Sequence, residues 1–365
     1  MRSSQGQYSL GREFFVDPAI FAREQETIFA QSWQMLGRDD EFAKPRAFRT
    51  AMIGGQPVVI VRGDDGRLRG FHNVCRHRGA MIVDAGRGCL EKASLTCPYH
   101  AWSYDLTGKL IGAPNMIGVD DFSRENYGLK SFHVESVHGF VFANLGNEPL
   151  ELASWLEPLQ THLTASGTEN LICARRIEYD VRANWKLLFE NYSECYHCPT
   201  VHPALNRLTP YRGASNEVQD GPILGGPMSL ADGVETMSTS GKRSGCWLPG
   251  LNADQRRSVY YFTVFPSFFL SFHPDYLLVH RIEPQTVDSS HVVCEFLFHP
   301  DTVADPKFDP ADAVEFWDLT NRQDWAVCER VQAGARSRAF SPGPLSELES
   351  VVAAFDRNYR KAMKL

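Results

Sequence analysis

The sequence predicts an α+β fold in which an all-β domain is inserted in a mixed domain that has an antiparallel sheet and covering helices. Two observations predict it. Short strand-like runs with Gly-rich turns dominate residues 46–147, whereas helical and strand-like patterns are mixed from residue 148 onward. A chain of 365 residues is comfortable for two domains. We therefore expect an N-terminal helix within 1–40 that packs on the mixed domain, then domains at 41–147 and 148–365.

Composition narrows the class of protein. With 43% hydrophobic and 12% aromatic residues the chain can build substantial cores. A net charge of −7 leaves no basic footprint, so we expect no nucleic-acid partner. No apolar run approaches the roughly 18 residues of a membrane-spanning helix, and the polar start lacks a signal-peptide core. We expect no membrane association and a cytoplasmic location. Nine cysteines without a regular spacing speak against a secreted disulfide scaffold.

The first elements follow from caps and periodicity. Asp17 and Pro18 begin a predicted helix with one apolar face, which we expect to run to about Gly37. Residues 57–61 are β-branched and predict a strand, and Asp65-Gly66 predicts a tight turn into a return strand at 68–74. Further short strands are expected as far as residues 139–144.

The second half mixes helices and strands. We expect a helix at 184–198, a loop or lid in the Gly- and Ser-rich segment 213–250, and several strands within 259–298. Those strands should break at three prolines: Pro266, Pro274 and Pro284. Two more helices are indicated, one from Asp309-Pro310 to about Gly334 and one after a capping box at Ser346 and Glu349.

Two short motifs each offer one thiolate and one imidazole: Cys75 with His77, and Cys97 with His100. Two thiolates can bind one iron of a [2Fe–2S] cluster while two imidazoles bind the other. The alternative is a structural zinc site with two Cys and two His ligands. Zinc knuckles usually pair Cys with Cys and His with His, so this spacing favours the cluster.

A second constellation follows in the predicted helix at 184–198. Glu190, Glu194 and His197 would share one helix face through their i+4 and i+3 spacing. His202 would lie beside His197 once Pro199 ends the helix. Two His ligands and one carboxylate form a facial triad with open positions for O2 and substrate.

Asp324 is the best candidate for that carboxylate because its neighbours are apolar, and an uncoordinated charge is costly there. Taken alone, His-x4-His is more often a pair of ordinary helix histidines, but the upstream Cys/His motifs reverse that preference. Cys195 and Cys198 form a Cys-x2-Cys that could indicate zinc or redox chemistry. We discount it, because His197 lies between the two and no second Cys pair follows.

Cys-Arg-His-Arg-Gly at 75–79 followed by Cys-Pro-Tyr-His-Ala-Trp at 97–102 resembles the α subunit of a Rieske non-haem iron oxygenase, over essentially the whole chain. The resemblance implies a Rieske [2Fe–2S] cluster on the first two motifs and a mononuclear Fe(II) on His197, His202 and Asp324. It places Asn191 toward that iron and implies a head-to-tail homotrimer. The chain has no nicotinamide, flavin or plant-ferredoxin motif. A separate NAD(P)H-dependent reductase, with or without a ferredoxin, must then supply electrons.

Glu194 departs from the commonest pattern of that family, in which ring dioxygenases usually have Asp. That acid bridges a cluster His of one subunit to an iron-binding His of its neighbour, so Glu194 would link His197 to His100 of an adjacent chain. A Glu resembles the branch that oxidises quaternary ammonium compounds (carnitine, glycine betaine, choline and stachydrine) and related N-dealkylating oxygenases. The alternative is that either acid bridges equally well.

The expected function is therefore that of a terminal oxygenase in a multicomponent system. It would use O2 to monooxygenate a carbon next to nitrogen, by N-dealkylation or hydroxylation of a quaternary ammonium or N-alkyl amide compound. One alternative is a ring-hydroxylating dioxygenase that gives cis-diols, and another is a Rieske electron carrier without catalysis. Pocket residues should come from 205–211, 213–250 and 259–298. Trp247, Tyr260 and Tyr261 could form an aromatic cage, although most strand aromatics should be core.

Overall fold

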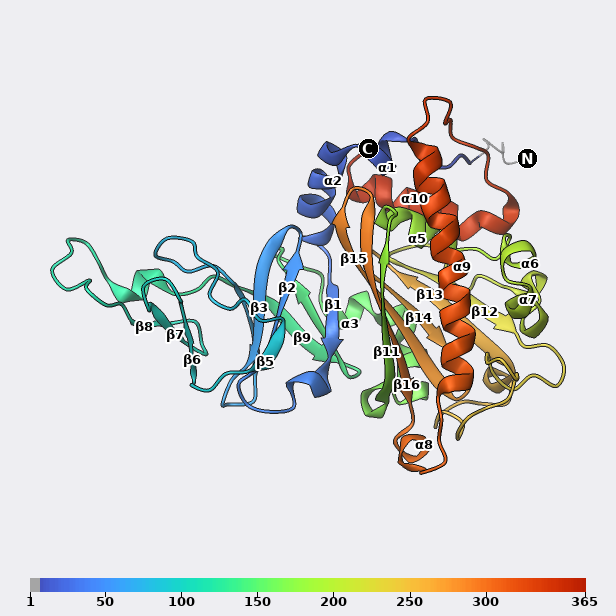
Figure 1. Ribbon diagram of the computed structural model, residues 1–365, viewed down its shortest axis with the longest axis horizontal. Coiled ribbons are helices and arrows are strands. Elements are labelled where there is room, and N and C mark those ends of the chain that lie inside the picture. The colour runs from blue at the N-terminus through green and yellow to red at the C-terminus, as the bar shows by residue number, and fades with distance from the viewer. Residues whose placement is uncertain (1–6) are drawn as a thin grey trace. The chain divides into compact units, whose positions relative to one another are not determined.

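A computed structural model describes residues 7–365 (Figure 1). Its contacts divide the chain into two units. One unit combines the segment up to Arg23 with the segment from Ser154 onward, and the other is Glu24–Ala153. The predicted insertion of a β-rich unit into a mixed unit is therefore confirmed.

The inserted unit is built on antiparallel strands. Within the described residues, its larger sheet has seven strands in the order β1-β10-β9-β4-β3-β2-β5, and a smaller one has the order β6-β7-β8. The predicted hairpin is confirmed: β3 and β4 pair, and Gly66 has the positive φ of 77° that a tight turn favours. The strands are β1 Gln34–Arg38, β2 Ala47–Ile53, β3 Gln56–Arg62, β4 Leu68–His72, β5 Arg87–Cys89, β6 Ser94–Thr96, β7 Ser103–Asp105, β8 Leu110–Gly112, β9 Ser131–Val137 and β10 Phe140–Asn144.

The predicted N-terminal helix is shorter than expected. It begins where expected, with α2 Pro18–Glu24, after a separate short helix, α1 Glu13–Val16, and ends in a wider turn at Gln25–Phe29. It does not reach Gly37, because Gln34–Arg38 forms strand β1 and pairs with β10. The Gln34 amide donates to the carbonyl of Phe29 at 3.1 Å and closes the helix end. Strand pairing with a distant segment overrides the local helical pattern here.

The other unit has a six-stranded antiparallel sheet among its described residues, in the order β11-β16-β15-β14-β13-β12. Its strands are rich in aromatic and β-branched residues, which suit a buried pleated surface. Two expectations were wrong. Strand β12 lies inside the segment 213–250, and Pro284 lies within β15, where the register with β16 shifts. The strands are β11 Ile172–Val181, β12 Ile223–Ser229, β13 Ser258–Val264, β14 Phe268–Phe272, β15 Tyr276–Thr286 and β16 Ser289–Phe298.

Helix α9 crosses this sheet (Figure 1). Side-chain hydrogen bonds join it to the strands: Trp317 Nε1 donates to the Tyr276 hydroxyl at 2.7 Å, and the Tyr179 hydroxyl donates to Asp318 at 2.8 Å. The capping box at Ser346 and Glu349 is confirmed and precedes α10. The helices are α3 Leu152–Trp155, α4 Gln160–Ser166, α5 Trp185–Tyr192, α6 Cys198–Val201, α7 Pro203–Leu208, α8 Pro300–Ala304, α9 Ala311–Ala335 and α10 Ser350–Ala362.

The predicted helix at 184–198 is broken in two. Asn184 caps α5 by accepting a hydrogen bond from the Lys186 N–H at 3.0 Å, and the Ser193 hydroxyl donates to the Phe189 carbonyl at 2.6 Å near the other end. Pro199 lies in the first turn of α6, so it begins a helix rather than ending one. Glu194 and His197 therefore lie in a connecting loop, and the shared helix face that the spacing predicted is wrong.

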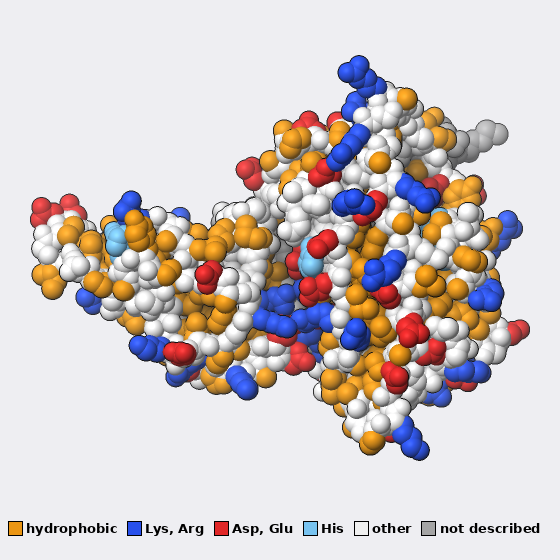
Figure 2. Space-filling model, viewed as in Figure 1, with side chains coloured by type: hydrophobic (Ala, Val, Ile, Leu, Met, Phe, Trp, Pro, Cys, Tyr) orange, Lys and Arg blue, Asp and Glu red, His pale blue; other side chains and the backbone are white. Residues whose placement is uncertain are grey.

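The surface carries mixed charge. Acidic and basic side chains alternate with apolar ones over the face of the mixed unit that Figure 2 shows. Within residues 7–365, none of the helices is both long enough and apolar enough to cross a bilayer.

Candidate active site and metal centres

The two Cys/His motifs occupy matching turns of the inserted unit. In the first, the Cys75 N–H donates to the Ala80 carbonyl at 2.8 Å, and in the second the Cys97 N–H donates to the Trp102 carbonyl at 2.8 Å. Gly79 and Ala101 have positive φ values of 76° and 57°, which close these turns. Each turn thereby carries a thiol and an imidazole, two positions apart in the first motif and three in the second.

The four side chains separate by depth. The Cys75 and Cys97 side chains are buried at 3% and 2% exposure, whereas His77 and His100 are exposed. The two imidazole rings lie 4.7 Å apart between centroids, and His77 stacks on Trp102 at 4.8 Å. Two buried thiols beneath two exposed imidazoles fit a cluster whose Cys-bound iron is inside and whose His-bound iron is outside.

Neighbouring side chains contact the candidate cluster ligands Cys75 and His77. The Tyr104 hydroxyl lies 3.3 Å from Cys75 Sγ and also accepts a hydrogen bond from the Arg76 N–H at 3.0 Å. A hydroxyl beside a ligand sulfur influences the reduction potential of a bound cluster. Desolvation, His100 and Arg78 lower the pKa of His77, which favours the neutral imidazole that binds a metal.

Three metal-binding side chains converge in the mixed unit: His197, His202 and Asp324. One donor atom from each lies within 4.8 Å of the others. Asp324 Oδ1 is 2.7 Å from His202 Nε2 and 3.3 Å from His197 Nε2. The residues come from the loop after α5, the α6–α7 junction and the middle of α9. This donor set fits the two-His, one-carboxylate triad of a non-haem iron.

The three side chains of the triad shift each other's pKa values. Burial opposes ionisation of Asp324, but hydrogen bonds from His197 and His202 outweigh it and lower the Asp324 pKa. Burial likewise opposes a charged His197, yet hydrogen bonds to Asp324 and Glu194 raise the His197 pKa to about 10. Asp324 and Glu194 therefore favour a positive charge at this position. A bound divalent cation can supply that charge in place of a proton.

Outer contacts orient both histidines. The His202 Nδ1–H donates to Gln323 Oε1 at 2.7 Å, which leaves Nε2 facing Asp324. Glu194 Oε1 lies 2.5 Å from His197 Nδ1, and its other oxygen accepts from the backbone N–H groups of His197, at 3.2 Å, and Tyr196. Such partners fix the tautomer and ring orientation of a metal-binding His. Sequence reasoning missed Gln323, whose position directly before Asp324 was an available signal.

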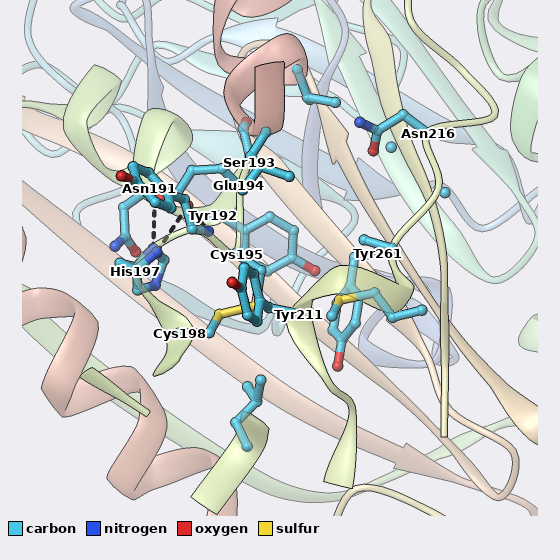
Figure 3. A pocket seen from close by; sticks show the side chains of 18 of the residues that line it. Asn191, Tyr192, Ser193, Glu194, Cys195, His197, Cys198, Tyr211, Asn216 and Tyr261 are labelled. Atoms are coloured by element: carbon cyan, nitrogen blue, oxygen red, sulfur yellow. Dashed lines mark hydrogen bonds and ion pairs between the residues drawn. A yellow bond between two sulfur atoms is a disulfide. The ribbon is translucent and has the colours of Figure 1, made fainter. Parts of the chain in front are cut away.

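A cavity of about 240 Å³ opens onto the triad (Figure 3). Its walls include parts of all three segments that the sequence predicted, and also α9 and the start of α10, which it did not. Asn191 and Glu194 both line it. Its described lining includes five Tyr or Trp side chains and one basic side chain: Tyr192, Tyr196, Tyr211, Tyr261, Trp317 and Arg212.

The expected aromatic cage is only partly correct. Tyr261 lines the cavity, but Trp247 and Tyr260 do not. Trp247 packs against the Arg243 guanidinium, 3.8 Å from its ring centroid, and Tyr260 packs against His162 at 4.5 Å. Alternate residues of a strand face opposite sides, so Tyr260 and Tyr261 could not both face the cavity.

A cluster motif in one unit and a triad of two His and one carboxylate in the other define an iron oxidoreductase that activates O2. The chain belongs to the Rieske-type ring-hydroxylating oxygenase α subunits. The family described as "Ring hydroxylating alpha subunit (catalytic domain)" matches residues 169–365, and the Rieske [2Fe-2S] domain matches residues 32–123. Its cofactors are a [2Fe–2S] Rieske cluster and a mononuclear iron, so an electron carrier without catalysis is excluded.

The chain is similar to oxygenase subunits of two kinds of monooxygenase. The glycine betaine monooxygenase oxygenase subunit of Chromohalobacter salexigens is 32% identical, over 95% of this chain and 83% of that protein. The carnitine monooxygenase oxygenase subunit of Acinetobacter pittii is 37% identical, over 54% of this chain and 53% of that protein.

Solved structures agree on the fold. A structure of the quaternary ammonium Rieske monooxygenase CntA superposes with a TM-score of 0.83 at 25% identity, and covers 98% of this chain and 96% of that one. Naphthalene 1,2-dioxygenase of Rhodococcus sp. superposes with a TM-score of 0.76 at 18% identity, over 97% of this chain and 94% of that one, and shares the fold.

Proposed function

We propose that this chain is the terminal oxygenase that monooxygenates a small zwitterionic quaternary ammonium compound at a carbon next to nitrogen. Cys75, His77, Cys97 and His100 would hold the cluster in a domain at 41–147. His197, His202 and Asp324 would hold the iron in a domain at 148–365. We further propose a cytoplasmic homotrimer that receives electrons from a separate NAD(P)H-dependent reductase, with or without a ferredoxin.

One observation carries the substrate class: the cavity beside the triad combines aromatic side chains with a single guanidinium. Tyr192, Tyr261 and Trp317 line it, and a quaternary ammonium group, which cannot donate hydrogen bonds, is attracted to the π-electron density of such rings. Arg212 is the only Lys or Arg in the described lining, and its Nε donates to the Tyr211 hydroxyl at 2.9 Å. Its other N–H groups suit a carboxylate. A betaine carries both charges.

The residues of the site have separate tasks. When bound, the iron and the cluster supply an O2-binding position and electrons respectively. Glu194 holds His197 and, we propose, contacts His100 of a neighbouring subunit so that electrons can pass between the centres. Asn191 lines the same cavity as Glu194 (Figure 3), and we propose that it points toward the iron.

Hydroxylation of a carbon attached to nitrogen gives a carbinolamine, which collapses to an aldehyde and the dealkylated amine. A ring dioxygenase would instead release a cis-diol. The test is a substrate panel with a surrogate reductase, scored by O2 uptake, aldehyde release and diol formation. Glycine betaine, carnitine and choline should be compared with an aryl substrate. Untouched quaternary amines together with a diol from the aryl compound would contradict the proposal.

Arg212 allows a sharper comparison. Arg212→Gln should raise KM for the substrates with a carboxylate and leave KM for choline, which has none, nearly unchanged. Arg212→Lys should restore part of the loss, because it keeps the charge but not the forked geometry. Equal changes in KM for choline and for the betaines would show that Arg212 does not bind the carboxylate.

A further inference from the structure

Cys195 and Cys198 form a disulfide in the wall of the iron cavity (Figure 3). Neither is a proposed metal ligand, and the sequence alone led us to discount redox chemistry at this pair. The two residues flank His197, and both line the same cavity as the triad. Within the described lining, no other cysteine does so.

The bond stabilises the fold less than most disulfides would. It joins residues only three positions apart, and closing so short a loop removes less entropy from the unfolded chain than closing a long one. The turn is already held without it, because the Cys198 N–H donates to the Cys195 carbonyl at 3.2 Å and Glu194 accepts from two further N–H groups. A Cys-x2-Cys pair is, however, the usual spacing of dithiols that cycle between reduced and oxidised forms.

The two cysteines differ in exposure. Cys195 is half-buried, whereas Cys198 is buried at 4% exposure. An oxidant that reaches the cavity therefore meets Cys195 first, and Cys198 is positioned behind it to form the disulfide. Reduction of O2 by two electrons and two protons gives hydrogen peroxide, so a cavity in which O2 is reduced exposes its thiols to that oxidant.

We propose that Cys195 and Cys198 are a reversible redox site that consumes peroxide in the cavity and is restored by a dithiol. The Cys195 thiolate attacks one peroxide oxygen, the O–O bond breaks, and sulfenic acid and hydroxide form. The Cys198 thiolate then attacks Cys195 Sγ, the S–S bond forms, and a second hydroxide leaves. With the two thiol protons the sum is two thiols plus H2O2 giving a disulfide plus two waters. Thiol–disulfide exchange with a dithiol reverses it.

The consequence concerns the iron ligands. Peroxide consumed by the pair does not oxidise His197, Tyr196 or other side chains of the cavity irreversibly. The pair therefore converts damage that would be permanent into a change that a cellular dithiol repairs. Because the triad is assembled in the structure that contains the disulfide, oxidation of the pair does not by itself displace the iron donors.

The state of the pair is directly measurable on the complete protein. Cleavage after Lys186 and Arg207 releases a peptide, 187–207, that contains Cys195 and Cys198 and no other cysteine. The protein is treated with dithiothreitol, then with hydrogen peroxide, then again with dithiothreitol, and is alkylated after each step. Mass spectrometry should show two alkylated thiols, then none, then two. A peptide that stays disulfide-bonded under dithiothreitol, or stays a dithiol under peroxide, overturns the proposal.

Variants test the protective role. After a peroxide challenge and dithiothreitol, wild-type protein and Cys246→Ser, a matched change at an exposed cysteine, should recover activity. Cys195→Ser should lose that recoverable fraction and accumulate oxidised His197 or Tyr196 in the same peptide. Recovery by Cys195→Ser equal to wild type overturns the role. Iron content and cluster absorption, measured in the same samples, correct for metal loss. The peptide assay needs no substrate, so it stands even if the proposed substrate class fails.

Discussion

Removing the Glu194 carboxylate separates iron binding from electron delivery. In Glu194→Ala, His197 loses the oxygen 2.5 Å from Nδ1, and the N–H groups of Tyr196 and His197 lose their acceptor. A carboxylate that orients a metal-binding His is worth about 10- to 100-fold in metal affinity or activity, or about 1.4–2.7 kcal/mol. Excess Fe(II) offsets a loss of that size, because the three direct donors are unchanged. We therefore expect both metal sites to fill.

Turnover should nevertheless be lost. If Glu194 also contacts a cluster His of the neighbouring subunit, the substitution removes the connection itself, and turnover should fall below about 1% of wild type, the limit of the orienting effect alone. Glu194→Gln keeps one of the two acceptor oxygens, so it can accept either from His197 Nδ1 or from the two backbone N–H groups, and it serves as the matched control. It should retain more activity than Ala.

The assay is a single turnover of pre-reduced protein mixed with O2 and substrate. Cluster absorption reports electron transfer, and metal analysis of the same sample reports iron. Wild-type clusters should reoxidise, whereas Glu194→Ala clusters should stay reduced at full iron content. Reoxidation of the Ala variant at the wild-type rate would refute the connection, and loss of iron even in excess Fe(II) would refute its separation from metal binding.

Three other substitutions test an iron ligand, an aromatic contact and a buried carboxyl group. Asp324→Ala should lower iron from about three to about two atoms per chain while cluster absorption is kept, and unchanged iron content would argue against the triad. Tyr261→Leu should raise KM for quaternary amines, whereas Tyr261→Phe should not, because the Tyr261 hydroxyl has no hydrogen-bond partner among residues 7–365; equal effects on KM would exclude the ring as the contact. Burial raises the pKa of Asp356 to about 7, against the opposing effect of Arg360. The folded chain thus holds this proton more tightly than the unfolded chain, and stability falls as pH rises from about 4 to about 7, by up to about 4 kcal/mol. Asp356→Asn should raise the unfolding temperature more at about pH 8 than at about pH 5, and a pH-independent gain would contradict this.

Some features could be predicted because their signals are local. The hairpin at Asp65-Gly66, the capping box at Ser346 and the helix after Pro310 depend on neighbouring residues, and the structure confirms them. The convergence of His197, His202 and Asp324 was expected from ligand chemistry together with family resemblance, and the donors do lie together.

Other features depend on distant contacts. Residues 34–38 have a helical pattern but pair with β10, and the break after Tyr192 depends on how the Ser193 hydroxyl meets the Phe189 carbonyl. The contribution of Trp317 to the cavity could not be read from its helix, because the side chain reaches the cavity only once α9 lies on the sheet. Likewise, the sequence pattern around Cys195 and Cys198 does not predict that their sulfurs lie within bonding distance.

The placement of Asp324 in the middle of α9 affects which parts of the site can change during evolution. Its carboxylate sits far from either end of a 25-residue helix that is hydrogen-bonded to the sheet. The segment around Arg212, by contrast, is exposed and connects short elements. Loops tolerate insertion and substitution far better than the elements that they connect. A change of substrate by remodelling of this segment would therefore leave the donors His197, His202 and Asp324 in place.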